Sequence, residues 1–500
     1  MKKQFIKIFA VAFLSLILFE ACDLTREPHN AIPRENALES ITDAQKWDTG
    51  FMAQLRNRVS GFYSTVQDYQ ADYLNASADF GNRGGAWYTW QTLNSGDYDV
   101  KDIWHNYYIA LKNINEFLFL AESFEAESDA DKAKMDAFKG DAHLLRAFYY
   151  YQLTIRYGRR YDAATASSDL SVPLVLKYDI TELPSRATNA EVFGQIAKDI
   201  DAAKTLLSAR DNKPMSRVLT PDAAIALEAR VALAKKDWPT ALSAAKKLID
   251  SGRYPLVNAD SSSFTNMWYG DDSTEDIVQL FVKKTDEEPN TIPFYGYNES
   301  QNANMPDWFP TQGIMDLYAE NDLRKDVYFE KADLVKVGDY NLTDVYVISK
   351  FKGNPEFNTT STPRYIIRPK LFRMGEIYMI AAEAAFNIPA EASNAKTYLN
   401  NFRASRGLPA IGTVTLQNIK DERTRELAFE GQRLWDLRRW GEPMDRLEPQ
   451  ISSDAGKEFL STVSPLDLTV PASSTRWIWP IPYNELTTNV NIKDQQNPGW

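Results

Sequence analysis

The segment from residue 220 to residue 252 constrains the fold most, because its cap residues specify where two successive helices begin and end. Thr220 is a suitable N-cap, and Pro221 takes the first helical position, where no hydrogen bond from its nitrogen is needed. A turn at residues 237–239 starts the second helix, and Gly252 can adopt the left-handed conformation that ends it. Both helices carry many small side chains, with alanine at positions 223, 224, 226, 229, 232, 234, 241, 244 and 245. The segment therefore predicts two helices that pack closely as a hairpin.

Two further pairs of helices are predicted from apolar residues that recur at helical spacing. The first pair spans residues 102–124 and 132–157, and the second spans residues 370–386 and 390–405, with Gly407 closing it. The pairs are unevenly spaced along the chain, so they do not form a strictly periodic array. The sequence therefore predicts a mainly α protein, a degenerate tetratricopeptide-like scaffold of helical hairpins with long irregular insertions rich in aromatic residues.

Two of these insertions, residues 79–100 and 286–310, have neither helical nor strand periodicity. Loops of this length in a compact protein are usually functional or disordered, and aromatic richness argues against disorder. A flat ring offers a large rigid face to a sugar or a peptide side chain, although some rings could instead fill the core of the loops. We predict ligand contact by Arg83, Trp87, Tyr88, Trp90, Asn94, Tyr295, Tyr297, Trp308 and Phe309. The tryptophans expected to be packing residues are Trp238, Trp435, Trp440 and Trp479.

The N-terminus has the layout of a secretory signal. Lysines at positions 2, 3 and 7 precede an apolar run over residues 8–19. This run is shorter than the ~20 residues that a membrane-spanning helix needs. Cys22 is the only cysteine, which excludes an internal disulfide, and residues 18–22 resemble a bacterial lipobox. We predict a signal peptide over residues 1–21, a lipid on Cys22 that anchors the protein on a membrane rather than in it, and a tether over residues 22–42. The alternative is an ordinary signal that ends near a buried thiol.

Charge and histidine content argue against several classes of function. The formal net charge is −12, and removal of residues 1–21 takes away three lysines and one glutamate, so the mature charge falls to −14. An acidic chain without a basic cluster interleaved with aromatic residues is not expected to bind nucleic acid. The three histidines are His29, His105 and His143, and no two of them have the spacing of zinc ligands on a helix. Phosphate-binding glycine loops and nucleophile elbows are also absent from the sequence, so we expect no metal and no cofactor.

The most distinctive motif is a run rich in charged and aromatic residues from Glu422 to Gly441. Supporting motifs follow one another in order along the chain, at residues 144–150, 322–324, 375–384, 399–409, 479–482 and 496–499. In content and order these segments resemble the SusD/RagB family. One departure is the sequence Tyr-Gly-Arg-Arg at residues 157–160, where the family often has an acidic residue and then proline.

The resemblance implies a cell-surface lipoprotein of the outer membrane that captures glycans, or oligopeptides, and delivers them to a SusC-like TonB-dependent transporter. It implies a loop-rich face that binds the nutrient and no catalytic activity. We expect an N-terminal helical region over residues 43–260, a loop-rich insertion region over residues 261–365 and a C-terminal helical region over residues 366–500. Two other functions stay open on the sequence alone. One is a surface hydrolase of helical architecture, whose paired carboxylates only a structure can reveal, and the other is a scaffold that holds partner peptides.

Charged residues between positions 422 and 441 are the strongest candidates for catalysis, but their spacing favours another role. Spacings of three and four residues place opposite charges side by side on a helix, and the residues concerned are Glu426, Glu430 and Asp436 with Arg423, Arg433 and Arg439. Arginine partners lower the pKa of a carboxyl group, whereas a general acid that works near neutral pH needs a raised pKa. We therefore expect a structural network of ion pairs here and no catalytic residue.

Overall fold

A computed structural model of the chain describes residues 34–179, 181–283, 289, 294–358, 366–450 and 466–500. Cys22 and the predicted signal peptide lie outside these ranges. The longer helices are α2 (Ile41–Arg58), α3 (Phe62–Gln70), α5 (Tyr98–Leu120), α6 (Asp129–Tyr157), α7 (Asn189–Leu206), α8 (Pro221–Lys235), α9 (Trp238–Asp250), α10 (Ser261–Tyr269), α13 (Met374–Phe386), α14 (Ala392–Ser405), α15 (Leu416–Glu426) and α16 (Arg433–Trp440). Shorter helices are α4 (Gly85–Thr89), α11 (Gln312–Met315), α12 (Lys325–Tyr328) and α18 (Tyr483–Thr488). In the described ranges no helix is both long and apolar enough to cross a membrane.

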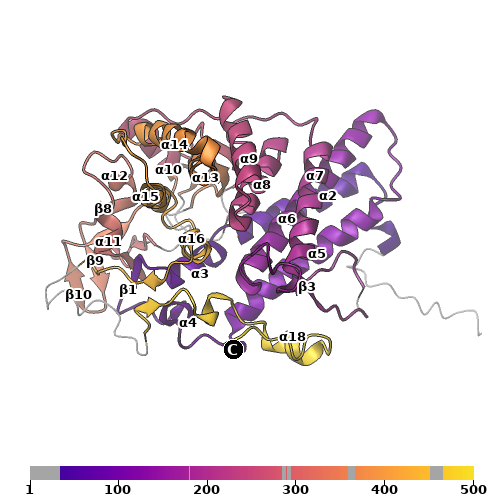
Figure 1. The fold of residues 1–500 in the computed structure, drawn as a ribbon, viewed down its shortest axis with the longest axis horizontal. Helices are drawn as coiled ribbons and strands as arrows, with labels where there is room; N and C mark the ends of the chain where they lie inside the picture. Colours follow the sequence, from indigo (N-terminus) through magenta and orange to yellow (C-terminus); the bar gives the residue numbers. More distant parts are fainter. Residues whose placement is uncertain (1–33, 180, 284–288, 290–293, 359–365, 451–465) are drawn as a thin grey trace, which may run out of the picture.

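The long helices pack against one another in succession. Contacts join α5 to α6, α6 to α7, α7 to α8, α8 to α9, α9 to α13 and α13 to α14. Figure 1 shows this series running from α2, α5, α6 and α7 at one end, through α8 and α9, to α13 and α14 at the other. The arrangement confirms the predicted mainly α scaffold of tetratricopeptide-like hairpins.

The hairpin of α8 and α9 has the caps that its sequence predicts. The Thr220 side chain accepts a hydrogen bond from the Ala223 N–H at 3.3 Å and so caps α8. The Asp237 side chain caps α9 in the same way, accepting from the Thr240 N–H at 3.3 Å. Gly252, just beyond the end of α9, has a φ of +64°, which is the left-handed conformation that glycine adopts without strain.

The predicted helix over residues 370–386 is wrong in its first turn, where the structure has a strand. Residues Lys370–Arg373 form β12, which pairs antiparallel with β4 (Asp276–Gln279). The Met374 N–H then donates to the Glu275 carbonyl oxygen at 2.9 Å, at the point where α13 begins. Apolar spacing over four residues cannot distinguish a short strand from a helical turn, so the long-range pairing decides the conformation.

The remaining strands are short: β1 (Leu74–Ala76), β2 (Leu170–Pro173), β3 (Arg186–Thr188), β5 (Tyr297–Asn298), β6 (Ala303–Asn304), β7 (Trp308–Pro310), β8 (Phe329–Lys331), β9 (Val335–Val337), β10 (Tyr340–Leu342), β11 (Tyr346–Ile348), β13 (Met444–Asp445) and β14 (Thr469–Val470). A four-stranded sheet has the order β10-β9-β6-β5. The antiparallel pair of β1 and β7 joins chain segments more than two hundred residues apart. The two predicted aromatic insertions are therefore not wholly irregular, because α4, β5, β6 and β7 lie within them.

The hydrophobic core does not follow the three predicted regions. One continuous cluster of buried apolar residues extends from Ala44 to Ile492 and includes Phe148, Trp308 and Ile380 from regions that we expected to be separate. The helical series and part of the strand-rich region therefore share this cluster, whereas residues around β9 and β11 form a smaller cluster of their own. The division at residues 260 and 365 stays a prediction about how the chain is organised.

Candidate functional site

The predicted ligand-binding residues fall into two groups by exposure. The side chains of Arg83 and Asn94 are exposed, and Tyr297 is half-buried. The others are buried in this structure: Trp87, Tyr88, Trp90, Tyr295, Trp308 and Phe309. A ring without exposed surface offers no face to a ligand in this arrangement, so the burial argues against direct contact by this second group. Their role in ligand binding stays a prediction that the structure does not support.

The buried rings hold the two loops onto the core. Trp308 stacks on Tyr69 with ring centroids 4.2 Å apart and an interplanar angle of 13°. The Trp87 ring lies 4.2 Å from that of Trp479, which the sequence indicated as a packing residue. The Trp90 indole N–H donates to the Gln70 carbonyl oxygen at 2.9 Å. These contacts account for the aromatic richness of the loops by packing.

The exposed members of the predicted set are held in place by polar contacts. The Arg83 guanidinium pairs with Asp307 and thereby links the first aromatic loop to the second. Asn94 accepts a hydrogen bond from the Gly96 N–H at 2.9 Å, which shapes its turn. The Tyr297 hydroxyl donates to the Asn302 side chain at 2.7 Å, and the Tyr297 ring stacks near that of Tyr295.

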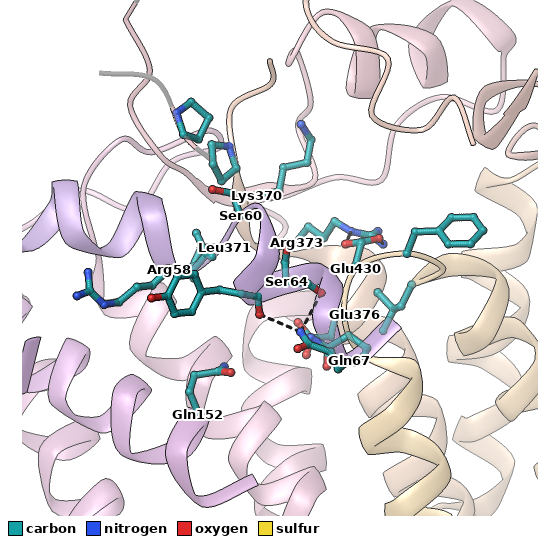
Figure 2. A pocket seen from close by; sticks show the side chains of 18 of the residues that line it. Arg58, Ser60, Ser64, Gln67, Gln152, Lys370, Leu371, Arg373, Glu376 and Glu430 are labelled. Carbon is teal, nitrogen blue, oxygen red and sulfur yellow. Dashed lines mark hydrogen bonds and ion pairs between the residues drawn. The ribbon is translucent and has the colours of Figure 1, made fainter. Parts of the chain in front are cut away.

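A pocket with a volume of about 120 Å³ lies between α3 and α6 on one side and β12 and the α15–α16 connection on the other. We call it the central pocket. Figure 2 shows Gln152 of α6 below the pocket and Lys370 of β12 above it. Its aromatic lining residues are Tyr63, Phe148, Tyr151, Trp268, Phe351, Phe429 and Trp435. Its polar lining residues are Arg58, Ser60, Ser64, Gln67, Gln152, Arg230, Lys370, Arg373, Glu376, Glu430 and Gln432.

Two of the three amide side chains in the central pocket are oriented by one buried arginine. Arg156 donates to the Gln67 side-chain oxygen at 3.2 Å and to the Gln152 side-chain oxygen at 2.5 Å. The Gln67 amide nitrogen in turn donates to the Ser64 carbonyl oxygen at 2.9 Å, and Figure 2 draws this bond. The Arg156 guanidinium lies 5.6 Å from the centre of the Trp435 ring, a cation–π contact that places this ring beside the amides.

Arg373 and Glu430 form the charged side of the central pocket, and the buried Lys350, which does not line the pocket, pairs with Glu430. The Lys350 ammonium lies 2.6 Å from a Glu430 carboxylate oxygen, and Arg373 pairs with the same carboxylate. Burial lowers the pKa of Lys350 to about 8, although the charge of Glu430 opposes the shift. Burial alone would raise the pKa of Glu430, but the charges of Arg373 and Lys350 hold it below its usual value. Glu430 is therefore ionised at neutral pH.

The expected ion-pair network around residues 422–441 is present, but a single helix does not form it. Phe429 and Gly431 both have left-handed φ values and break the segment into α15 and α16. Glu426 consequently pairs with distant arginines, namely Arg324, Arg373 and Arg406. Among the residues predicted to form the network, Asp436 and Arg439 do pair at helical spacing, with their charged atoms 3.0 Å apart. Burial would raise the pKa of Glu426, yet the surrounding arginines hold it well below its usual range, which does not suit a general acid.

The sequence reasoning missed the central pocket. Its walls come from segments around residues 60, 150, 370 and 430, and no local pattern shows that they meet. Trp435 was expected only to pack, whereas it is half-buried and lines the pocket. Among the described residues, no group of three or more histidine, cysteine, aspartate or glutamate side chains is placed to hold a metal ion.

The fold is that of a mainly helical protein. Family models match both halves of the chain. The model described as the SusD family matches residues 258–500, and the model described as starch-binding and associating with the outer membrane matches residues 33–233. The chain belongs to the SusD/RagB family, as the resemblance of its motifs predicted.

Particular relatives match over nearly the whole chain. SusD-like protein P2 of Formosa agariphila is 24% identical, with 99% of this chain and 100% of that protein covered. A SusD superfamily protein of Bacteroides thetaiotaomicron is 23% identical, with 92% and 100% covered and a TM-score of 0.77. Surface glycan-binding protein A of Bacteroides fluxus is 19% identical, with 93% and 100% covered and a TM-score of 0.67. At these identities the structural likeness shows a shared fold.

Proposed function

We propose that this chain is a non-catalytic lipoprotein of the outer-membrane surface that captures glycan and delivers it to a SusC-like TonB-dependent transporter. Family membership carries the proposal, because both halves of the chain match family models and one of these models is described as starch-binding and outer-membrane associated. Surface glycan-binding protein A of Bacteroides fluxus has the same fold. The predicted lipid on Cys22 supplies the anchor in this proposal.

The central pocket is our proposed glycan site. A sugar ring has an apolar C–H face that packs on an aromatic ring and hydroxyl groups that bond to amides and carboxylates. The pocket combines the half-buried rings of Tyr63 and Trp435 with the amides of Gln67, Gln152 and Gln432. Arg156 fixes two of these amides in advance, so little conformational freedom is lost on binding.

The exposed loop residues Arg83, Asn94 and Tyr297 form a second candidate surface for the same ligand. They retain accessible polar groups, and Tyr297 retains part of its ring surface. An oligopeptide would also find hydrogen-bond partners at either place, so the ligand panel has to include peptides.

Asp68 is unsuited to act as the acid or base of a hydrolase, because it is enclosed in the interior. Burial raises the pKa of Asp68 to about 7, which would suit an acid or base near neutral pH. Asp68 is fully buried, however, and it accepts hydrogen bonds from the Tyr73 hydroxyl at 2.5 Å and the Gly431 N–H at 3.0 Å. A carboxyl group enclosed in this way has no access to a substrate.

The test is a binding experiment with residues 23–500 against polysaccharides and oligopeptides, by affinity electrophoresis and calorimetry. We expect Gln152→Ala and Trp435→Ala to weaken glycan binding roughly tenfold or more, because each removes a contact worth about 1–3 kcal/mol. Phe119→Ala is the control, since Phe119 is an aromatic residue with 51% exposure in the last turn of α5 and does not line the central pocket. Circular dichroism verifies that each variant folds.

Four results would contradict parts of the proposal. Unchanged binding in both pocket variants, with loss in Asn94→Ala and Tyr297→Ala, would move the ligand to the loop surface. Release of shortened products would establish a hydrolase. Absence of binding to every glycan, with a peptide bound, would replace the ligand class, and failure of a SusC-like transporter to co-purify with the full chain would remove the delivery step.

A further inference from the structure

A second, smaller pocket with a volume of about 50 Å³ lies beside the central pocket. We call it the basic pocket, because six arginines line it and Asp436 is the one acidic residue among its described lining residues. The arginines are Arg159, Arg160, Arg230, Arg423, Arg438 and Arg439. The two pockets adjoin, because they share the lining residues Tyr151, Ile155, Arg230, Gln432 and Trp435.

Four of these arginines have carboxylate partners and two do not. Arg230 pairs with Glu376, Arg439 with Glu383 and Asp436, Arg423 with Asp436, and Arg159 with Asp169. Across the part of the chain that the structure describes, no carboxylate lies within ion-pair distance of Arg160 or Arg438. The same holds there for Lys235 and Lys236, at the end of α8 beside the pocket. Four cations at this place are therefore not balanced by acidic side chains.

The C-terminal ends of helices offset part of this positive charge. The Arg438 guanidinium donates to the carbonyl oxygens of Ile155 and Gly158 at the end of α6, at 2.7 Å each. Arg160 donates to the Arg438 carbonyl oxygen at 3.2 Å, near the end of α16, and α8 also ends here. Each helix C-terminus is equivalent to about half a negative charge, so three ends offset only about 1.5 of the four positive charges.

A buried, unsatisfied donor in the same pocket points to a missing acceptor. Arg423 lines the pocket and is 2% exposed, and its Nη1 has no hydrogen-bond partner. Leaving a buried donor of a charged group without a partner is unfavourable, because the donor has lost its bonds to water. In addition, burial lowers the pKa of Arg438, and the charge of Arg160 lowers it further, which reflects the same shortage of negative charge.

We propose that the basic pocket binds a carboxylate or sulfate group of an acidic saccharide whose uncharged part occupies the central pocket. The inference rests on the proposed glycan-binding function and adds the charge class of the ligand. Arginine is well suited to this role because its planar donors match the geometry of a carboxylate or sulfate.

The experiment compares acidic oligosaccharides with their neutralised forms by calorimetry at low salt, using residues 23–500. Uronate-containing probes are paired with their methyl esters, and sulfated probes with their desulfated forms, which distinguishes carboxylate from sulfate as the source of the anion. We expect the acidic form of at least one pair to bind roughly tenfold or more tightly than its neutral form. Arg160→Gln is expected to abolish this preference, because it removes a positive charge that no described carboxylate balances. Arg160 is exposed and can be replaced without opening the core.

Lys247→Gln is the matched control, since it removes the same unit of charge from an exposed position on α9 away from the pocket. Equal binding of acidic and neutral forms, with no effect of Arg160→Gln, would overturn the inference and leave the proposed function intact. Failure of every saccharide would instead contradict the proposed function. The melting temperature in inorganic sulfate then decides the anion site by itself: a rise that Arg160→Gln removes supports it, and no rise overturns it.

Discussion

Asp48 of α2 and Asp141 of α6 are hydrogen-bonded to each other in the interior, and only Asp141 has a cation. Arg210 donates to both carboxylate oxygens of Asp141, at 2.6 and 2.7 Å. Burial, followed by the charge of Asp141, raises the pKa of Asp48 to about 9. Asp48 therefore holds the proton of the pair at neutral pH, and Asp141 keeps the charge beside Arg210.

This pair predicts a loss of stability as the pH rises. Above a pH of about 4 the unfolded chain releases the Asp48 proton while the folded chain retains it up to a pH of about 9, so the free energy of unfolding falls over this window. For one proton the slope is at most about 1.4 kcal/mol per pH unit. Asp48→Asn keeps a neutral side chain of the same shape and should flatten the dependence between pH 5 and pH 8, measured by urea unfolding.

Asp201→Asn is the control for this prediction, because Asp201 has a side-chain exposure of 74%. The control should retain the pH dependence of the unaltered protein. An Asp48→Asn variant that follows the same curve as the control would show that Asp48 does not carry the retained proton.

At the scale of single residues, the sequence indicated which aromatic residues are distinctive, but not whether they are buried or line a pocket. Aromatic residues in two long insertions suggested ligand contact, yet Trp87, Trp90 and Trp308 are buried. Their partners Tyr69, Gln70 and Trp479 come from distant parts of the chain, so no local pattern could reveal the packing. Trp435 shows the opposite error: we expected it to be a packing residue, but it lines both pockets.

At the scale of elements, the turn between α15 and α16 positions the wall of the central pocket. Gly431 has a φ of +69°, and its N–H donates to Asp68. A Cβ atom at this glycine would lie 2.5 Å from the Ser64 carbonyl oxygen and 2.3 Å from the Gln67 side-chain nitrogen. The turn therefore fits closely against α3, and no side chain can be added there without moving backbone.

Gly431→Ala is expected to destabilise the protein more than Gly252→Ala does. Gly252 has a similar φ of +64° but nothing within 4 Å of its would-be Cβ, so its substitution measures the left-handed strain alone, about 1–2 kcal/mol. Displacement of Ser64 and Gln67 should add about 1–3 kcal/mol for Gly431→Ala, measured by denaturant unfolding. Equal losses in the two variants would mean that α3 moves aside without strain.

Helices were predictable from sequence where caps and small residues agree, as in α8 and α9, and less so where long-range pairing intervenes. The strand β12 and the break between α15 and α16 both depend on partners far along the chain, such as Glu275 for Met374 and Asp68 for Gly431. Local periodicity carries no information about such partners. The central pocket lies between these two elements, and it was missed for the same reason.

At the scale of the whole molecule, the predicted regions are joined by contacts that one region cannot make alone. β1 of the N-terminal region pairs with β7, and Asp72 pairs with Arg433 at 2.6 Å. The Trp479 N–H donates to the Arg156 carbonyl oxygen at 2.8 Å, so the C-terminal segment covers the end of α6. Separation of the regions would expose apolar surface on both sides.

We therefore expect residues 23–500 to unfold in urea in one cooperative transition. Far-UV circular dichroism, which reports mainly on the helices, and tryptophan fluorescence, which also reports on the buried rings of the loops, should give the same midpoint. Two separate transitions would show that the regions at residues 260 and 365 fold independently, in spite of their shared core.

The anchoring of the first aromatic loop also bears on how the protein can diversify. Trp87 and Trp90 fix the loop to the interior, while Arg83 and Asn94 stand at exposed positions beside them. Substitution of Arg83 removes its pair with Asp307, but the buried anchors stay in place, so the loop can acquire new chemistry and keep its attachment to the core. In a protein built in this way, a few surface positions can vary while the scaffold stays constant.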